Sequence, residues 1–369
     1  MKILVTGSKG FIGKNLVAEL NNLEYGDILH FNRDTEWNLL EKYTNECDFV
    51  FHLAGVNRPE KEEEFMEGNA NFTSQLLELL TKNNNKAPIL ITSSIQAEQE
   101  NPYGKSKKTG EKMIFNYGKQ TGSKVYVYRL PNVFGKWSKP NYNTVVATYC
   151  YNVARNMDIK INNPDAQLTL CYIDDVIKEF VAVLNNQIGN KEKIYKIPKE
   201  YSVTLGDLAE TIKSFKESRN DLMVPNMENE LTKKLYSTYL SFLPEDNFSY
   251  DLKMNVDQRG SFTEFIKTPD RGQVSINVSK PGITKGNHWH HTKNEKFLVV
   301  SGKGQIRFRK IESDEVIEYN VSGEKLEVVD IPTGYTHSIV NTGETELVTV
   351  MWANELFDQD NPDTYYVEV

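Results

Sequence analysis

Short runs of β-branched and aromatic residues alternate with amphipathic segments through the first half of the chain. The four clearest runs read as buried strands between polar segments, at residues 2–6, 48–53, 88–92 and 125–129. The segments at 11–20 and 71–80 carry apolar residues at helical spacing. Such alternation of strands and helices predicts a parallel sheet that helices cover on both faces.

The pattern changes after about residue 250. From Gly260 onward, Gly, Pro and Asn separate short strands roughly every 8 to 12 residues, which is typical of an antiparallel sandwich or barrel. A polar segment at 219–247 contains a helical run near 231–242, and we place the domain boundary at its end. The sequence thus predicts an α/β domain over residues 1–246 and an all-β domain over residues 247–369.

Composition narrows the function classes. The chain has 369 residues, of which 39% are hydrophobic, so it can bury more than one core. A net charge of −8 without a basic block predicts no nucleic-acid partner, because counterion release needs clustered cations. No apolar run approaches the roughly 18 residues of a membrane span, so no membrane insertion is expected. The start of the chain lacks a leader pattern and Cys47, Cys150 and Cys171 are scattered, which favours a reducing cytoplasm.

Three glycines follow the first predicted strand, at Gly7, Gly10 and Gly13. They permit a tight turn, a close approach of the backbone to a pyrophosphate, and close helix–strand packing. Free N–H groups at the start of the next helix would attract the phosphates. The spacing is G-x-x-G-x-x-G and not G-x-G-x-x-G, so a plain glycine-rich turn stays as the alternative.

The residues about 20 positions further on distinguish the two nicotinamide cofactors. An acidic residue there would bind the 2′-hydroxyl of NAD, whereas this chain has Asn32 and Arg33, followed by Asp34. A guanidinium at Arg33 can pair with a 2′-phosphate, so the sequence favours NADPH. NADH stays as the alternative, because Asp34 would take the place of Arg33 at the ribose if the end of the second strand were shifted by one residue.

Tyr103 and Lys107 are four residues apart on a predicted helix and therefore share a face. A nearby ammonium is expected to lower the pKa of the Tyr103 phenol from its ordinary value of about 10 towards neutrality. The phenol could then give a proton to a carbonyl oxygen as hydride arrives. Ser93 and Ser94 end the preceding strand and offer a hydroxyl to the same oxygen. A Tyr-x-x-x-Lys pair on an exposed helix is the alternative without function.

Together these motifs resemble the extended short-chain dehydrogenase/reductases that act on nucleotide sugars, over residues 1 to about 245. The resemblance rests on the segment at 6–13, the His-Leu-Ala-Gly segment at 52–55, Asn69 and the Tyr-x-x-x-Lys pair. It implies a Rossmann fold with Ser94, Tyr103 and Lys107 as catalytic residues. It also implies cofactor contacts at Gly7, Gly10, Phe11, Ile12, Gly13, Asn32, Arg33, Leu53, Ala54 and Lys107, and a substrate contact at Asn132. Ile95 and Gln96 stand where sugar dehydratases carry an acidic pair, which favours carbonyl reduction over dehydration.

Four of the six histidines lie in the second predicted domain, three of them at His288, His290 and His291. In a strand the first two point to one face and the third to the other. A turn at 292–294 can bring Glu295 to the same interior, and His337 follows a Pro-x-Gly turn. Three imidazoles and one carboxylate suit Zn²⁺, with Fe²⁺, Mn²⁺ and Ni²⁺ as alternatives. Core histidines beside a surface glutamate would be the reading without a metal.

The full spacing resembles the two-part cupin motif, Gly282-x5-His288-x-His290-x4-Glu295-x6-Gly302 and Pro332-x-Gly334-x2-His337-x3-Asn341. The resemblance implies an all-β cupin barrel with a metal, zinc first, bound by His288, His290, Glu295 and His337. Some cupins use three side chains, which leaves His288 open. The segment at 257–264 is similar to the entry segment of cupin-fold deoxysugar epimerases and implies substrate contacts at Arg259 and Glu264. A charged strand edge is the alternative there.

The fusion of the two halves resembles the bifunctional capsular-polysaccharide enzymes of UDP-N-acetyl-L-fucosamine synthesis. The resemblance implies that the cupin domain epimerises C3 of a UDP-2-acetamido-2,6-dideoxy-4-hexulose. The reductase domain would then reduce the C4 ketone with NADPH, giving UDP-2-acetamido-2,6-dideoxy-L-talose. It further implies a homodimer. Three alternatives remain: a 4-keto-sugar reductase whose cupin is a structural or dimerisation module, a cofactor-sensing binding protein, and an oxygen-using Fe²⁺ cupin.

Overall fold

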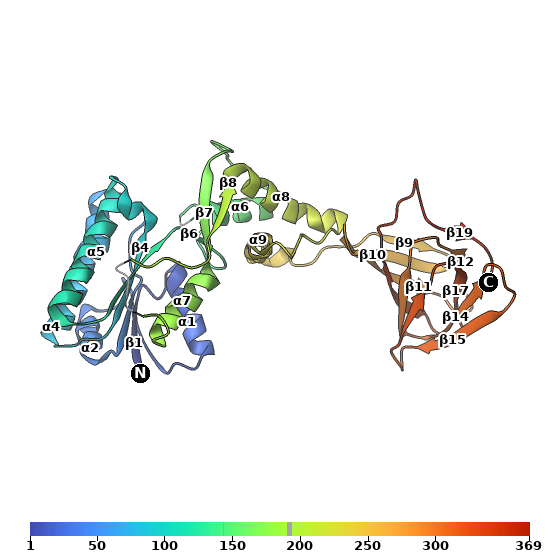
Figure 1. Ribbon diagram of the computed structural model, residues 1–369, viewed down its shortest axis with the longest axis horizontal. Helices are drawn as coiled ribbons and strands as arrows, with labels where there is room; N and C mark the ends of the chain where they lie inside the picture. Colours follow the sequence, from blue (N-terminus) through green and yellow to red (C-terminus); the bar gives the residue numbers. More distant parts are fainter. Residues whose placement is uncertain (143, 190–193) are drawn as a thin grey trace. The chain divides into compact units, whose positions relative to one another are not determined.

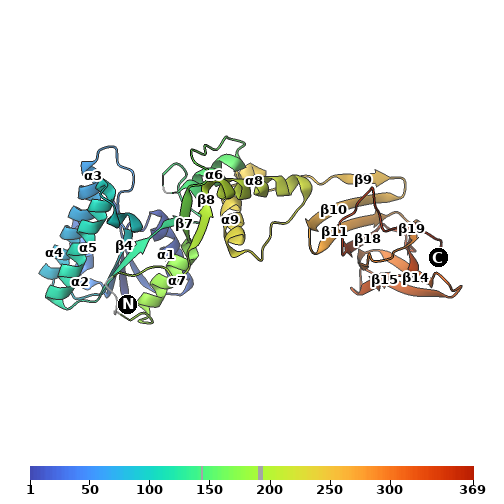
Figure 2. The ribbon, with the colours of Figure 1, turned by 45° about the horizontal axis from the view of Figure 1, so that its top comes forward.

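The structure is a computed structural model that describes residues 1–142, 144–189 and 194–369. The chain divides into two compact units, which Figures 1 and 2 show from two directions. The first unit comprises Met1–Lys213 and Asn229–Pro244, and the second comprises Ser214–Glu228 and Glu245–Val369. The segment Ser214–Glu228, which we expected in the first domain, thus belongs to the second unit. The domain limits 1–246 and 247–369 stay a prediction.

A five-stranded parallel sheet forms the centre of the first unit, in the order β2-β1-β3-β4-β5. Its strands are β1 (Lys2–Thr6), β2 (Asp27–Phe31), β3 (Phe49–His52), β4 (Ile89–Ser94) and β5 (Val125–Leu130). One face is covered by α1 (Phe11–Asn22) and α7 (Ile173–Leu184), and the other by α2 (Trp37–Glu46), α4 (Phe72–Lys82) and α5 (Pro102–Thr121). The predicted parallel sheet between two helical layers is confirmed.

Burial on both faces explains the sequence of these strands. Ile3 and Val5 of β1 pack in the core that α1 and α7 close, whereas Leu4 packs in the core on the opposite face. All residues of β3 and β4 are buried, so both strands begin as apolar runs without polar alternation, and their polar residues stand only at the carboxyl ends that face the site. The helix α5 begins where the Asn101 side chain accepts a hydrogen bond from the Gly104 N–H, with Pro102 in the first turn.

The remaining elements of the first unit include a three-stranded sheet in the order β6-β7-β8. They are α3 (Glu63–Phe65), the π-helical turn Met66–Asn71, the 3₁₀ turn Ile95–Glu98, β6 (Asn132–Phe134), α6 (Val145–Ala154), β7 (Gln167–Tyr172), β8 (Tyr201–Thr204), α8 (Leu205–Asp221) and α9 (Glu230–Leu240). The division between the units falls within α8. None of the helices in the described parts of the chain is both long and apolar enough to cross a bilayer.

Two antiparallel sheets make up the second unit, in the orders β16-β13-β18-β11-β10-β9 and β15-β14-β17-β12-β19. Their strands are β9 (Met254–Asp257), β10 (Gly260–Thr268), β11 (Gly272–Ser279), β12 (Thr284–Trp289), β13 (Glu295–Ser301), β14 (Lys303–Lys310), β15 (Val316–Ser322), β16 (Val328–Ile331), β17 (Tyr335–Asn341), β18 (Leu347–Ala353) and β19 (Tyr365–Tyr366), after the 3₁₀ turn Glu245–Asn247. Both sheets contribute to one apolar core, with Phe297 and Leu347 from the first and Ile306 and Phe308 from the second. The predicted all-β domain is confirmed.

The close contact between β1 and α1 can be tested at Gly13. A Cβ at this residue would lie 2.2 Å from the Gly7 carbonyl oxygen and 2.7 Å from the Ser8 Cα. Gly13→Ala therefore has to displace the helix, and we expect it to lower the free energy of unfolding by roughly 1–3 kcal/mol. Chemical denaturation measures the change. Gly26→Ala is the control, since a Cβ there meets nothing within 4 Å, and equal midpoints for the two variants would contradict the prediction.

Candidate functional sites

Two glycines beside the cavities, Gly7 in the turn between β1 and α1 and Gly55 after β3, have no room for a side chain. Gly7 has a φ of +73°, and a Cβ on it would lie 2.8 Å from the backbone of Ala54. A Cβ on Gly55 would lie 2.8 Å from the Asn69 Oδ1 atom and 3.1 Å from the Lys107 Nζ atom. These glycines keep the backbone itself at the surface of the neighbouring cavities, as the approach of a pyrophosphate requires.

Two adjoining cavities of about 540 and 740 Å³ open beside this turn and share several of its residues. Between them they contain every site residue that the sequence predicts for the first domain. The residues are Gly7, Gly10, Phe11, Ile12, Gly13, Asn32, Arg33, Leu53, Ala54, Ser94, Tyr103, Lys107 and Asn132. The structure thus brings the predicted cofactor contacts and the predicted catalytic residues together around two adjoining cavities.

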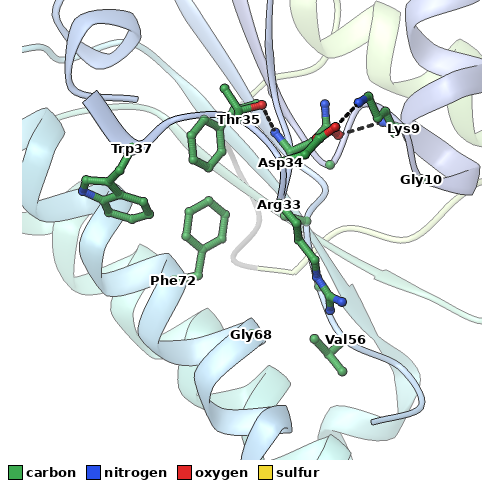
Figure 3. A pocket seen from close by; sticks show the side chains of 14 residues that line it. Lys9, Gly10, Arg33, Asp34, Thr35, Trp37, Val56, Gly68 and Phe72 are labelled. Carbon is green, nitrogen blue, oxygen red and sulfur yellow. Dashed lines mark hydrogen bonds and ion pairs between the residues drawn. The ribbon is translucent and has the colours of Figure 1, made fainter. Parts of the chain in front are cut away.

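The smaller cavity, shown in Figure 3, has a charged rim and an aromatic wall. At the rim the Lys9 ammonium forms an ion pair with Asp34 and holds the pKa of that carboxyl below its usual range. The Asn32 carboxamide oxygen accepts a hydrogen bond from the Lys9 N–H at 2.9 Å. The Arg33 side chain runs along the cavity (Figure 3). The sequence analysis did not predict the role of Lys9. Its ammonium neutralises Asp34, the carboxylate that left NADH as the alternative cofactor.

The larger cavity contains the predicted catalytic residues. The Lys107 Nζ atom lies 5.8 Å from the centre of the Tyr103 ring and donates to the Thr92 carbonyl oxygen at 3.2 Å. Burial raises the pKa of Tyr103 to about 12, although a hydrogen bond with Ser94 acts in the opposite direction. Burial also lowers the pKa of Lys107 to about 8.

The expected lowering of the Tyr103 pKa by Lys107 is therefore wrong for this structure. Desolvation of the phenol raises the pKa, because a buried group favours its neutral form, and the opposing hydrogen bond comes from Ser94 and not from Lys107. Tyr103 consequently keeps its proton at neutral pH, which is the state that a proton donor needs.

Sequence reasoning also missed a buried carboxylate behind the site, Glu111, whose side chain is 4% exposed. It accepts hydrogen bonds from Ser93 Oγ at 2.5 Å and from Arg129 Nε and Nη2 at 2.8 and 2.7 Å. The two serines therefore have different partners: the Ser93 hydroxyl donates to Glu111, whereas Ser94 forms a hydrogen bond with Tyr103. The spacing could have revealed Glu111, because it lies one helical turn after Lys107 on the same face of α5.

In the second unit, the structure brings together the four predicted metal ligands. Candidate ligand atoms of His288, His290, Glu295 and His337 all lie within 4.8 Å of one another. His288 lies near the end of β12, and His290 directly follows that strand. Glu295 is the first residue of β13, and His337 lies in β17. The Glu295 Oε2 atom lies 3.3 Å from His337 Nε2 and 3.6 Å from His290 Nε2.

The chemistry of this cluster fits a divalent metal. The Nε2 atoms of His290 and His337 and the Oε2 atom of Glu295 are buried and have no hydrogen-bond partner within the described ranges. Burial opposes ionisation of Glu295, but its two histidine neighbours outweigh burial and hold its pKa well below the usual range. Burial lowers the pKa of His288 to about 4, so this ring is neutral at pH 7, as a ligand must be. Nitrogen and carboxylate donors in this number are those of zinc sites in proteins.

The other predicted residues of the second unit lie in different surroundings. His291 is exposed, with its ring against Trp289 and Tyr365, so it points away from the cluster as the strand alternation predicts. Arg259 sits at the turn between β9 and β10 and pairs with Asp257 at 2.6 Å. Glu264 pairs with Lys267 at 2.8 Å. Both pairs fit the charged-edge alternative, and substrate contacts at Arg259 and Glu264 stay a prediction.

Comparisons with known proteins cover both units. A model of the NAD dependent epimerase/dehydratase family matches residues 3–197, and a model of the polysaccharide biosynthesis C-terminal domain matches residues 255–365. The UDP-2-acetamido-2,6-beta-L-arabino-hexul-4-ose reductase of Pseudomonas aeruginosa is 47% identical over 369 residues, which cover 100% of this chain and 99% of that protein. The crystal structure of the capsular polysaccharide assembling protein CapF from Staphylococcus aureus has a TM-score of 0.95 at 55% identity, covering 100% of both chains. The UDP-glucose 4-epimerase of Thermotoga maritima, at 21% identity and a TM-score of 0.56, covers 66% of this chain and 98% of its own, a likeness in fold alone.

The Glu111 carboxylate raises the pKa of Lys107, which burial lowers to about 8. A protonated Lys107 attracts an anionic cofactor, so NADPH affinity should fall as the pH rises through about 8. Glu111→Gln removes the opposing charge and should move this fall to lower pH, by roughly one unit or less. Fluorescence titration of NADPH across pH measures the shift. Glu98→Gln is the control, because Glu98 also pairs with Arg129 but is 75% exposed, and identical pH profiles for the two variants would rule the role out.

Proposed function

Since the chain belongs to the NAD dependent epimerase/dehydratase family, we propose that it reduces a UDP-bound 4-keto sugar with NADPH and that its second unit epimerises the same sugar at C3. The observation that carries the reductase is the cavity that joins the glycine turn to Ser94, Tyr103 and Lys107. The 47% identical relative, named for a 4-keto UDP-sugar substrate, supports that choice of substrate class. The proposed product is UDP-2-acetamido-2,6-dideoxy-L-talose, a precursor for capsular polysaccharide.

In the proposed reduction each residue of the first site has a defined task. NADPH, when bound, supplies the hydride that reduces the C4 ketone. Tyr103 holds a proton at neutral pH and donates it to the C4 oxygen, while Ser94 orients the phenol and the substrate oxygen. Lys107 lies behind the phenol and would bind the ribose of the cofactor. Asn132 lines the same cavity and is a proposed substrate contact.

The preference for NADPH over NADH is proposed from the rim of the smaller cavity. Arg33 and Lys9 place two cations there, and the single nearby carboxylate, Asp34, is paired with Lys9. A 2′-phosphate would gain charge-assisted hydrogen bonds from the guanidinium. A free 2′-hydroxyl would gain less, because the carboxylate that could accept from it is already engaged.

The second unit is proposed to act on the same carbonyl group. His288, His290, Glu295 and His337 would hold a divalent metal, zinc by first choice. Such a metal acts as a Lewis acid towards a carbonyl oxygen. A proton at C3 is acidic only while C4 is a ketone, so epimerisation has to precede the reduction, which then fixes the new configuration.

We also propose a cytoplasmic homodimer. Supporting an interface, the edge strand β9 exposes two apolar side chains on one face, with Met254 59% and Val256 69% exposed. The three cysteines are free and buried, as in a protein of a reducing compartment.

The division of labour between the two units predicts separable activities. Tyr103→Phe removes the proton donor and should lower NADPH oxidation by about 10²–10⁴-fold, while deuterium exchange at C3 in D₂O continues. NMR of one reaction with a UDP-4-keto sugar, with and without NADPH, follows both processes. The converse variant, His337→Ala, should lose the exchange and keep NADPH binding. Loss of both activities in Tyr103→Phe would contradict the assignment.

The cofactor preference predicts that Arg33→Ala weakens NADPH binding by about 10–100-fold and changes NADH binding little, because only NADPH carries the 2′-phosphate. Lys9→Ala should act in the same direction, since it releases the Asp34 charge towards the phosphate. Lys42→Ala, an exposed lysine of α2 outside both cavities, is the control. Equal losses for NADPH and NADH in Arg33→Ala would show that Arg33 does not select the cofactor.

A further inference from the structure

The last residues of the chain return to the strands that carry the metal-ligand cluster. β19 (Tyr365–Tyr366) pairs antiparallel with β12 and places Tyr366 opposite His288. Thr336 of β17 donates its hydroxyl to the carbonyl oxygen of Val367. The C-terminal segment, residues 363–369, is therefore bonded to both strands of this sheet that hold ligands.

Asp363 begins this segment, and its carboxylate lies against the turn between β12 and β13. One oxygen accepts a hydrogen bond from the His291 N–H at 2.9 Å. The other accepts from the N–H groups of Thr292 and Lys293 at 2.7 and 2.9 Å, and from the Thr292 hydroxyl at 3.1 Å. Three successive backbone N–H groups that converge in this way form an anion-binding concavity, here occupied by the protein's own carboxylate. The turn that connects the ligands of β12 to Glu295 is held by this contact.

The backbone of Asp363 acts on a ligand directly. Its carbonyl oxygen forms a hydrogen bond with the Nδ1 atom of His290. A carbonyl oxygen can only accept, so Nδ1 carries the proton of the ring and Nε2 keeps its lone pair. That Nε2 atom is buried, has no hydrogen-bond partner in the described part of the chain, and lies 3.6 Å from Glu295 Oε2. The C-terminal segment thus fixes the tautomer in which His290 can bind a metal.

We propose that Asp363 is a positioning residue of the metal centre, through which the C-terminal segment sets the affinity for the metal. Its carboxylate holds the ligand-bearing turn, and its carbonyl oxygen orients the imidazole of His290. Hydrogen-bonded partners of metal-bound histidines typically contribute 10–100-fold to metal affinity. None of the residues of this segment belongs to the apolar core between the two sheets, so removing the Asp363 side chain leaves that core unchanged. The inference rests on the proposed metal centre.

The test measures metal affinity in the full-length protein. Metal-free protein is titrated with Zn²⁺ or Co²⁺ in competition with a chromophoric chelator. Asp363→Ala should weaken binding by about 10–100-fold and alter the visible spectrum of the Co²⁺ form. The isosteric Asp363→Asn keeps one acceptor oxygen and should fall between the wild type and Asp363→Ala. Asp360→Ala removes an exposed carboxylate three residues earlier and should bind like the wild type.

Two measurements separate the outcomes. The circular dichroism spectrum of the metal-free variants at the titration temperature and NADPH binding by the first unit should match the wild type, which shows that a loss of metal affinity does not arise from misfolding. Equal affinities for Asp363→Ala, Asp360→Ala and the wild type would overturn the role of Asp363 while leaving the metal centre intact. A wild-type protein that binds neither Zn²⁺ nor Co²⁺ would instead overturn the proposed metal centre itself.

Discussion

A buried polar atom without a partner costs about 1–3 kcal/mol, and the second unit gathers several of them at one point. His290, Glu295 and His337 direct such atoms at one another, beside a core of Phe297, Phe308 and other apolar side chains. With the His290 proton on Nδ1, the neutral ring cannot donate to Glu295, so its Nε2 lone pair and the carboxylate oxygen both face the cluster as acceptors. A cation satisfies both of them together. The convergence of β12, β13 and β17 is therefore the feature that supports the proposed metal centre.

In the first unit, burial determines the protonation of the candidate catalytic residues. Desolvation favours the neutral form of every titratable group, so it raises the pKa of Tyr103 and lowers that of Lys107. The two shifts have opposite signs but one cause. Glu111, buried one turn further along α5, supplies the negative charge that partly restores the cationic form of the lysine. The protonation states of Tyr103 and Lys107 thus depend on how deeply α5 buries these side chains, as well as on the distance between them.

Local patterns were enough to predict most of the fold. The predicted strand at 2–6 coincides with β1, and the helix expected at 11–20 is α1, which extends to Asn22. Strand alternation was enough to place His288 and His290 on one side and His291 on the other. The contacts that sequence reasoning missed join distant residues: Asp363 lies 72 residues from His291, and Glu111 lies 18 from Arg129. The error on the Tyr103 pKa has a similar origin, since spacing gives neighbours on a helix and not the solvent that tertiary packing removes.

The path of the chain between the two units has a consequence for dissecting the protein. The chain joins the second unit at Ser214, returns to the first at Asn229 for α9, and leaves again after Pro244. In the second unit the returning stretch is anchored by backbone hydrogen bonds, with Val224 donating to Lys267 and Lys267 donating to Leu222. No single cut therefore yields two complete units. A fragment that ends at residue 244 still carries the segment Ser214–Glu228 of the second unit, and a fragment that starts at residue 245 lacks it. To isolate either unit whole, the chain would have to be cut at each of the three points where it passes between the units, and its pieces rejoined.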